Sequence, residues 1–170
     1  MAKYAALLRG VNVGGKSLAM PDLVGLVEGL GGRDVRTYLQ SGNVVYTGTK
    51  QVAGGLEHAL LAELGVRSPV LVRSARELAA LVAAKPYAAQ GKSVSVTFLG
   101  GSAPADRLAA VDPGAFGSAE FEVSGREIYL HTPGGYGRSK LNNAFWERKL
   151  STVATTRNWN TVLALAEMTA

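Results

Sequence analysis

The fold of this chain follows from VRTYLQSGNVVYT, residues 35–47. Apolar and polar side chains alternate over residues 35–40, which is typical of a β-strand with one buried face. Ser41–Gly42 predict a two-residue turn, and residues 43–47 predict a strand that returns beside the first. The stretch therefore indicates an antiparallel hairpin.

The segments around this hairpin predict the rest of the first half. Residues 3–9 predict a short apolar strand, and residues 21–30 predict a helix that begins with a proline and stops at a glycine pair. Residues 51–64 carry valine or leucine at a spacing of four, which predicts a second helix. A strand at 69–73 completes the order β-α-β-β-α-β, the ferredoxin-like unit.

The second half of the chain predicts the same order of elements. The predicted elements are a linking helix at 76–84, strands at 93–100 and 151–155, helices at 105–111, 140–150 and 158–168, and a hairpin at 121–131 that turns at Ser124–Gly125. We therefore expect an α+β fold of two ferredoxin-like halves with antiparallel sheets, produced by internal duplication, and an extra C-terminal helix. The expected domains are residues 1–85 and 92–170, with a boundary in PYAAQGKS at 86–93.

The composition is that of a folded, basic protein. Hydrophobic residues make up 47% of the 170 residues and charged residues 18%, the opposite of the balance in disordered chains. The net charge of +5 favours anionic partners such as nucleic acid or phosphorylated metabolites. A basic protein without any such partner is the alternative. The chain has no cysteine, which excludes disulfides and thiolate chemistry.

The apolar segments are too short for a membrane protein. None approaches the roughly 20 residues that a spanning helix needs. Arg9 interrupts the first apolar residues, so the N-terminus does not match a signal peptide. We expect a cytoplasmic protein without membrane contact.

LLRGVNVGGKS, residues 7–17, matches the spacing G-x-x-x-x-G-K-[ST] of phosphate-binding P-loops. A P-loop needs a helix that starts at its lysine, whereas Pro21 places the helix start several residues after Lys16. No predicted strand ends in the aspartate that would hold magnesium, and the hairpin excludes parallel β-α-β connections. ATP binding through this loop is therefore not expected.

Three segments carry a family resemblance: LLRGVNVGGK at 7–16, VRTYLQSGNVVY at 35–46 and TTRNWNTVLALAEM at 155–168. Together with SPVLVRS, VTFL and YGRSK in the same order, they resemble the bacterial domain-of-unknown-function 1697 family over essentially the whole chain. The resemblance implies a pair of ferredoxin-like α+β units and no assigned biochemical role. It supplies no catalytic residues that could be carried over.

Glycine-rich basic loops contain the first candidate binding residues. The loop at 9–16 offers successive backbone amides that can surround an anion, or it is only a long connection that needs glycine. The loop at 131–141 places basic side chains beside a predicted helix start with Ser139 as N-cap, and it offers Tyr136 for stacking. A solvated loop is the alternative.

The hairpin turn and the final helix contain the others. Gln40 and Asn43 present amides to a ligand or serve only the turn. Arg157 falls in the first turn of the last helix, where a cation opposes the helix dipole unless it pairs with an anion. The full ligand-binding set is Arg9, Asn12, Gly14, Gly15, Lys16, Gln40, Asn43, Tyr136, Arg138, Ser139, Lys140, Arg157, Asn158 and Asn160.

Acid–base and metal-binding groups are few. His131 ends a strand beside the second glycine-rich loop and is the weak candidate for a general acid or base. The two histidines are far apart in the sequence, and no acidic cluster has the spacing of metal ligands, so no metal is expected. No set of nucleophile, base and orienting group follows from the spacing, so catalytic residues and cofactors are not assigned.

Three functions fit these residues. The leading hypothesis is a module that binds a phosphorylated ligand or single-stranded nucleic acid through its basic loops. The alternatives are an enzyme acting on a phosphorylated or nucleotide-like small molecule and an interaction protein without a ligand. Convergence of the basic side chains on one site would separate the first two from the third.

Overall fold

The computed structural model describes residues 1–13, 17–88 and 93–170. By its contacts the chain divides into two units, one of Met1–Ala83 with Leu163–Ala170 and the other of Ala84–Val162. The domain bounds expected from the sequence stay predictions, and residues 89–92 of the expected boundary lie outside the described residues.

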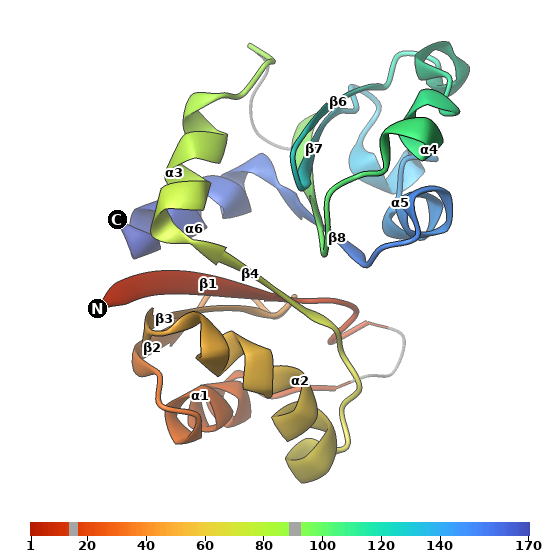
Figure 1. The fold of residues 1–170 in the computed structure, drawn as a ribbon. Helices are drawn as coiled ribbons and strands as arrows, with labels where there is room; N and C mark the ends of the chain where they lie inside the picture. The colour runs from red at the N-terminus through yellow and green to blue at the C-terminus, as the bar shows by residue number, and fades with distance from the viewer. Residues whose placement is uncertain (14–16, 89–92) are drawn as a thin grey trace. The chain divides into compact units, whose positions relative to one another are not determined.

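The first unit is built on one antiparallel sheet. Its strands are β1 (Ala2–Leu8), β2 (Arg33–Thr37), β3 (Asn43–Gly48) and β4 (Val70–Ser74), in the order β2-β3-β1-β4. Helices α1 (Met20–Gly29) and α2 (Lys50–Leu64) cover one face, and α3 (Ala75–Ala83) follows β4 on the other (Figure 1). This strand order is that of a ferredoxin-like unit.

The core of the first unit lies between the sheet and its two long helices. Leu8 and Tyr46 face the helices from the sheet, and Leu23 and Leu56 meet them from α1 and α2. Helix α2 ends at Gly65, whose φ of 65° is left-handed. Glycine adopts this conformation without the penalty that a Cβ imposes, so the predicted stop is confirmed.

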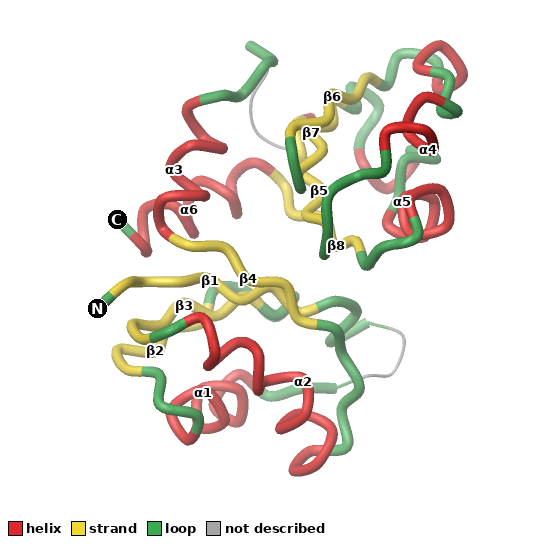
Figure 2. The backbone as a smooth tube through the Cα atoms, viewed as in Figure 1, coloured by secondary structure: helices red, strands yellow, loops and turns green. Residues whose placement is uncertain are grey.

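The second unit repeats this arrangement. Its strands are β5 (Val94–Leu99), β6 (Glu120–Ser124), β7 (Glu127–His131) and β8 (Ala154–Asn158), in the order β6-β7-β5-β8. Helices α4 (Ala105–Ala109) and α5 (Asn143–Leu150) lie beside this sheet, and α6 (Trp159–Thr169) follows β8 (Figure 2). Short 3-10 helices lie at Pro113–Phe116 and Tyr136–Arg138. The predicted α+β fold of two ferredoxin-like halves is thus confirmed.

Both hairpin turns of the structure differ in position or length from the turns predicted from the sequence. Five residues, 38–42, join β2 to β3, because Leu39 and Gly42 have φ of 61° and 91° and Asn43 donates from Nδ2 to the Tyr38 carbonyl at 2.7 Å. The second turn consists of Gly125 and Arg126, one residue later than predicted, because Ser124 still pairs with Glu127.

Several elements after residue 105 also have bounds that differ from the predicted ones. Helix α4 ends at Ala109 and not at Val111. Helix α5 begins at Asn143, because the side chain of Asn142 accepts from the Phe145 amide at 2.9 Å and caps it. The strand predicted at 151–155 is β8 at Ala154–Asn158. The sequence therefore located each strand and each α-helix, with bounds displaced by up to three residues, and it did not predict the two 3-10 helices.

The surroundings of the P-loop pattern are not those of a triphosphatase. Residues 17–19 are not helical, α1 starts at Met20, and both neighbours of β1 are antiparallel to it. The glycine-lysine part of the pattern, residues 14–16, lies outside the described residues. In the part of the chain that the structure describes, no helix is long and apolar enough to cross a membrane.

Candidate functional site

A cavity of about 370 Å³ lies within the second unit, between two loops. Residues 115–119, which lead into β6, form one wall. Residues 132–135 and 138–140, which follow β7, form the other. The volume lies in the range of small-molecule sites, roughly 300–1,000 Å³.

Backbone hydrogen bonds hold both walls. The Thr132 amide donates to the Ser93 carbonyl at 2.8 Å, and the Gly135 amide donates to the Thr132 carbonyl at 2.8 Å. On the other wall, the Ala115 amide donates to the Asp112 carbonyl and the Ala119 amide donates to the Phe116 carbonyl, both at 3.1 Å. These bonds order the two loops, which include the short 3-10 helices at Pro113–Phe116 and Tyr136–Arg138.

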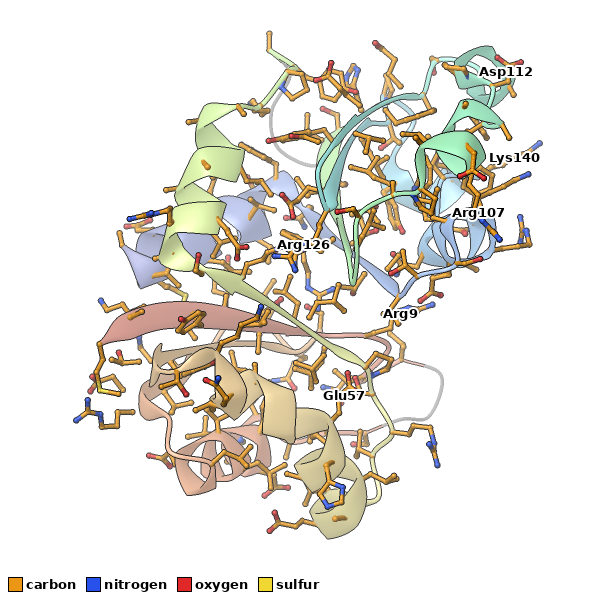
Figure 3. All side chains as sticks on the ribbon, viewed as in Figure 1. Arg9, Glu57, Arg107, Asp112, Arg126 and Lys140 are labelled. Atoms are coloured by element: carbon orange, nitrogen blue, oxygen red, sulfur yellow. The ribbon has the colours of Figure 1, made fainter. Side chains whose placement is uncertain are left out.

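The described lining of the cavity carries positive charge only. Arg138 and Lys140 are exposed and belong to it, and no aspartate or glutamate is among the described lining residues. Figure 3 labels Lys140 on the same side of the second unit as Arg107 of α4. Arg138 and Lys140 together raise the local concentration of anions at the cavity and can bind a phosphate or carboxylate.

An aromatic cluster supports the apolar part of the cavity. Phe116 lines it and packs edge-on against Phe145, with ring centroids 5.4 Å apart. Phe145 in turn packs edge-on against Trp146, which is fully buried. Phe116 therefore offers an apolar surface on rigid support.

Thr132 is a buried polar residue of the cavity. It is 2% exposed, and its Oγ1 has no hydrogen-bond partner in the part of the chain that the structure describes. The only other buried side-chain atom of this kind among the described residues is Nε1 of Trp146. A buried hydroxyl without a partner is unusual in a folded protein and is found where a ligand or water completes the bonding.

Comparison with known proteins identifies the family. The model of the protein family described as "Protein of unknown function (DUF1697)" matches residues 1–129. The chain belongs to this family. The chain is similar to the conserved bacterial protein SP0830 from Streptococcus pneumoniae, with a TM-score of 0.76 at 19% sequence identity, and the match covers 99% of this chain and 98% of that chain. No curated protein matches the chain.

Membership of the DUF1697 family and the structural likeness establish the fold and assign no role. The family match includes the cavity wall at 115–119 and ends before the wall at 132–140.

The predicted residues of the second glycine-rich loop lie together. Arg138, Ser139 and Lys140 all line the cavity, whereas Tyr136 packs against the core of the second unit. The prediction of Ser139 as a helix N-cap was wrong, because α5 starts later and the Ser139 hydroxyl accepts from the Leu141 amide at 3.1 Å.

The predicted residues of the first unit have mainly structural contacts. Asn12 donates from Nδ2 to the carbonyls of Leu18 and Gln40, at 3.0 and 2.6 Å, and accepts from the Leu18 amide at 2.7 Å. Asn43 is fully buried in the hairpin connection. The Arg9 backbone bonds to the strand entry at 68–69, and Gln40 is exposed. Gly14, Gly15 and Lys16 lie outside the described residues.

Arg157 is not in the first turn of a helix. It lies in β8, is 7% exposed, and donates from Nη1 to the Thr155 hydroxyl at 2.7 Å and the Thr156 carbonyl at 3.1 Å. The dipole argument for an anion at Arg157 is thus removed, and Arg157 is not among the described residues that line the cavity. Asn158 caps α6 by accepting from the Thr161 amide at 2.9 Å, and Asn160 is exposed in α6.

His131 is separated from the cavity. Its Nδ1 lies 3.3 Å from Oε1 of Glu120, its partner in the β6–β7 ladder, and its ring packs 5.4 Å from that of Tyr87. Side chains alternate along a strand, so His131 and its neighbour Leu130, which packs in the core, point to opposite faces. Within the described residues, no three histidine or acidic side chains are grouped to hold a metal ion.

Two parts of the cavity escaped sequence reasoning. The wall at 115–119 has no charged residue, and Thr132 is a single hydroxyl at a strand end. The glycines of FGSA and GGYGRSK could have indicated the cavity, because they mark a loop before β6 and a loop after β7. These two strands pair with each other in the hairpin, so the two loops lie at the same end of it.

Proposed function

We propose that the second unit binds a phosphorylated small molecule in the cavity between residues 115–119 and 132–140. The observation that carries the proposal is the placement of Arg138 and Lys140 on one cavity with no acidic residue in its described lining. Arginine offers a planar pair of donors to phosphate oxygens, and lysine adds a mobile point charge.

The shape of the site favours a small molecule over a nucleic-acid strand. Single-stranded nucleic acid is bound along an extended groove with aromatic side chains that stack on successive bases. Here the charges lie at one cavity of about 370 Å³, and Phe116 is the only aromatic residue in its described lining. Such a site fits one phosphorylated group with a compact organic part.

The chemistry of the lining favours binding over acid–base catalysis. Its described residues offer cations, hydroxyls and backbone amides, and none of them is a histidine or a carboxylate. His131, the weak candidate for a proton carrier, pairs with Glu120 away from this lining. We therefore propose a binding module.

Thermal unfolding with and without ligand tests the proposal. Ribose 5-phosphate is a suitable probe, and ribose without phosphate is its matched control. A ligand at 100 times its Kd stabilises the folded state by about 2.7 kcal/mol. For a chain of this size that corresponds to a rise in Tm of roughly 5–10 °C. Ribose is expected to leave the Tm unchanged.

A pair of double variants separates a site from general charge. Arg138→Ala with Lys140→Ala removes both cations of the cavity and is expected to abolish the shift. Lys50→Ala with Arg76→Ala removes the same charge from exposed positions of α2 and α3 in the first unit and is expected to retain the shift. Equal loss of the shift in both double variants would show only general charge attraction and would refute the site.

A further inference from the structure

We infer that Thr132 selects the organic part of the ligand: its hydroxyl hydrogen-bonds a hydroxyl or carbonyl group of a phosphate monoester whose phosphate lies at Arg138 and Lys140. The inference rests on the proposed function and deepens it, because it names the ligand class as a phosphorylated polyol or sugar.

The Thr132 hydroxyl is buried and has no partner in the part of the protein that the structure describes. Thr132 lines the cavity, is 2% exposed, and has no partner for Oγ1 among the described residues. A buried hydroxyl without a partner is costly, so such groups are found where a ligand or ordered water completes the bonding.

The Thr132 backbone is held at two points. Its amide donates to the Ser93 carbonyl and its carbonyl accepts from the Gly135 amide, both at 2.8 Å. Rotation about χ1 between staggered positions remains available to the side chain. In the ligand-bound protein the hydroxyl takes the staggered position that faces the cavity, which Thr132 already lines.

The cavity is larger than one phosphate group needs, with a volume of about 370 Å³. An inorganic phosphate with its five heavy atoms fills less than half of that space, which leaves room for an organic part near Phe116 and Thr132. The ligand therefore needs both an anionic end and a polar, compact remainder.

Trp146 shows that an unpartnered atom alone does not make a site. Its Nε1 is also buried without a partner among the described residues, but Trp146 is not among the described residues that line the cavity. Thr132 differs because the same cavity also holds Arg138 and Lys140.

Calorimetric titration of three proteins with two probes tests the inference. The probes are ribose 5-phosphate and inorganic phosphate, and the proteins are the wild type, Thr132→Val and Thr132→Ser. Valine keeps the shape of threonine and removes the hydroxyl, whereas serine keeps the hydroxyl. We expect Thr132→Val to raise the Kd for ribose 5-phosphate about 3- to 10-fold. The Kd for inorganic phosphate should stay within about twofold of the wild-type value. Thr132→Ser is expected to bind both probes as the wild type does.

Stability of the unliganded variants supplies a second readout. Removal of a buried hydroxyl that lacks a partner should leave the Tm of Thr132→Val unchanged or raised. A fall in Tm would show that the hydroxyl is bonded within the protein and would overturn the inference. If valine prevents folding, the inference is overturned by the same reasoning, and Thr132→Ser checks that the backbone tolerates substitution.

The remaining outcomes are distinguishable. Wild-type affinity for ribose 5-phosphate in Thr132→Val overturns the role of Thr132 and leaves the proposed function intact. Equal weakening of both probes places the hydroxyl at the phosphate and overturns the assignment to the organic part. Absence of binding to the wild type refutes the proposed function itself.

Discussion

Arg73 and Arg157 occupy the same position in the two sheets. Each is the fourth of five residues in the last strand of its unit, and each donates from Nη1 to the carbonyl of the preceding residue, at 3.0 Å to Val72 and 3.1 Å to Thr156. Both are buried, with 2% and 7% of their surface exposed. The two halves therefore match in the position and hydrogen bonding of these arginines as well as in their order of elements.

The residue after each arginine begins a helix in the same way. Ser74 accepts from the Glu77 amide at 3.1 Å through its hydroxyl, and Asn158 accepts from the Thr161 amide at 2.9 Å through Oδ1. Each side chain satisfies one of the free amides at a helix start. The repeated unit is therefore β-α-β-β-α-β-α, and α3 and α6 are its equivalent last helices.

Truncation of either arginine should destabilise the protein. Arg73→Ala and Arg157→Ala each remove a buried side chain and its hydrogen bonds, so we expect each to lower the free energy of unfolding by about 2–5 kcal/mol. Urea unfolding measures the change. The exposed Arg148→Ala is the control and should stay within about 1 kcal/mol of the wild type. A loss of less than 1 kcal/mol at both buried arginines would refute their structural role.

Gly42 should not tolerate a side chain. Its φ is 91°, and a Cβ there would lie 2.6 Å from Cγ2 of Val11 and 2.9 Å from Cβ of Leu8. Gly42→Ala is therefore expected to lower the free energy of unfolding by about 2–4 kcal/mol. Gly54→Ala, at an open position inside α2, should raise it by roughly 0.5–1 kcal/mol. Chemical denaturation of both variants checks the opposite signs, and a stable Gly42→Ala protein would rule out this close contact.

Tyr46 should make the protein less stable in alkali. Burial raises the pKa of Tyr46 to about 12 from 10.0, and its hydroxyl donates to the Thr49 carbonyl at 3.0 Å. Because the folded-state pKa lies above the unfolded one, this contribution is fully present below pH 10 and is lost as the pH rises to about 12. Ionisation of Tyr46 is expected to lower the free energy of unfolding by up to about 3 kcal/mol.

Comparison with Tyr46→Phe isolates this effect. At pH 8 the variant should be about 1 kcal/mol less stable than the wild type, because it lacks the hydrogen bond to Thr49. Between pH 10 and 12 the difference should shrink and then reverse. The free energy of unfolding at several pH values measures it, and a constant difference across that range would argue against the raised pKa.

Asn12 should support the fold and not the proposed ligand. Its side chain makes three hydrogen bonds that join the loop after β1 to Leu18 and Gln40. Asn12→Ala should therefore cost about 1–3 kcal/mol of stability, also because its φ is 55°. Its affinity for ribose 5-phosphate should equal that of the wild type, and a tenfold loss would move the anion site to the first unit.

Local sequence patterns carried most of the fold. Alternation in 35–40 predicted the first hairpin, the Ser124–Gly125 pair predicted the second, and the valine and leucine spacing in 51–64 predicted α2. The errors lie where a side chain and not a pattern sets the boundary. Asn142 caps α5, which begins at Asn143, three residues after the predicted start. The buried Asn43 closes a five-residue connection where a two-residue turn was predicted.

The site was only partly predictable. Arg138, Ser139 and Lys140 were found because basic residues beside glycines stand out in the sequence. Arg157 was misplaced because TTRN can extend a strand as well as open a helix, and pairing with β5 decides between them. Thr132 could not be found, because an unbonded hydroxyl depends on contacts that no spacing encodes.

Titration of the isotopically labelled protein with ribose 5-phosphate, followed by amide chemical shifts in NMR spectra, locates the ligand directly. We predict saturable shifts concentrated at residues 115–119 and 132–140, which Arg138→Ala with Lys140→Ala abolishes. Shifts centred on other residues, or no shifts at all at millimolar ligand, would show that this cavity is not the binding site.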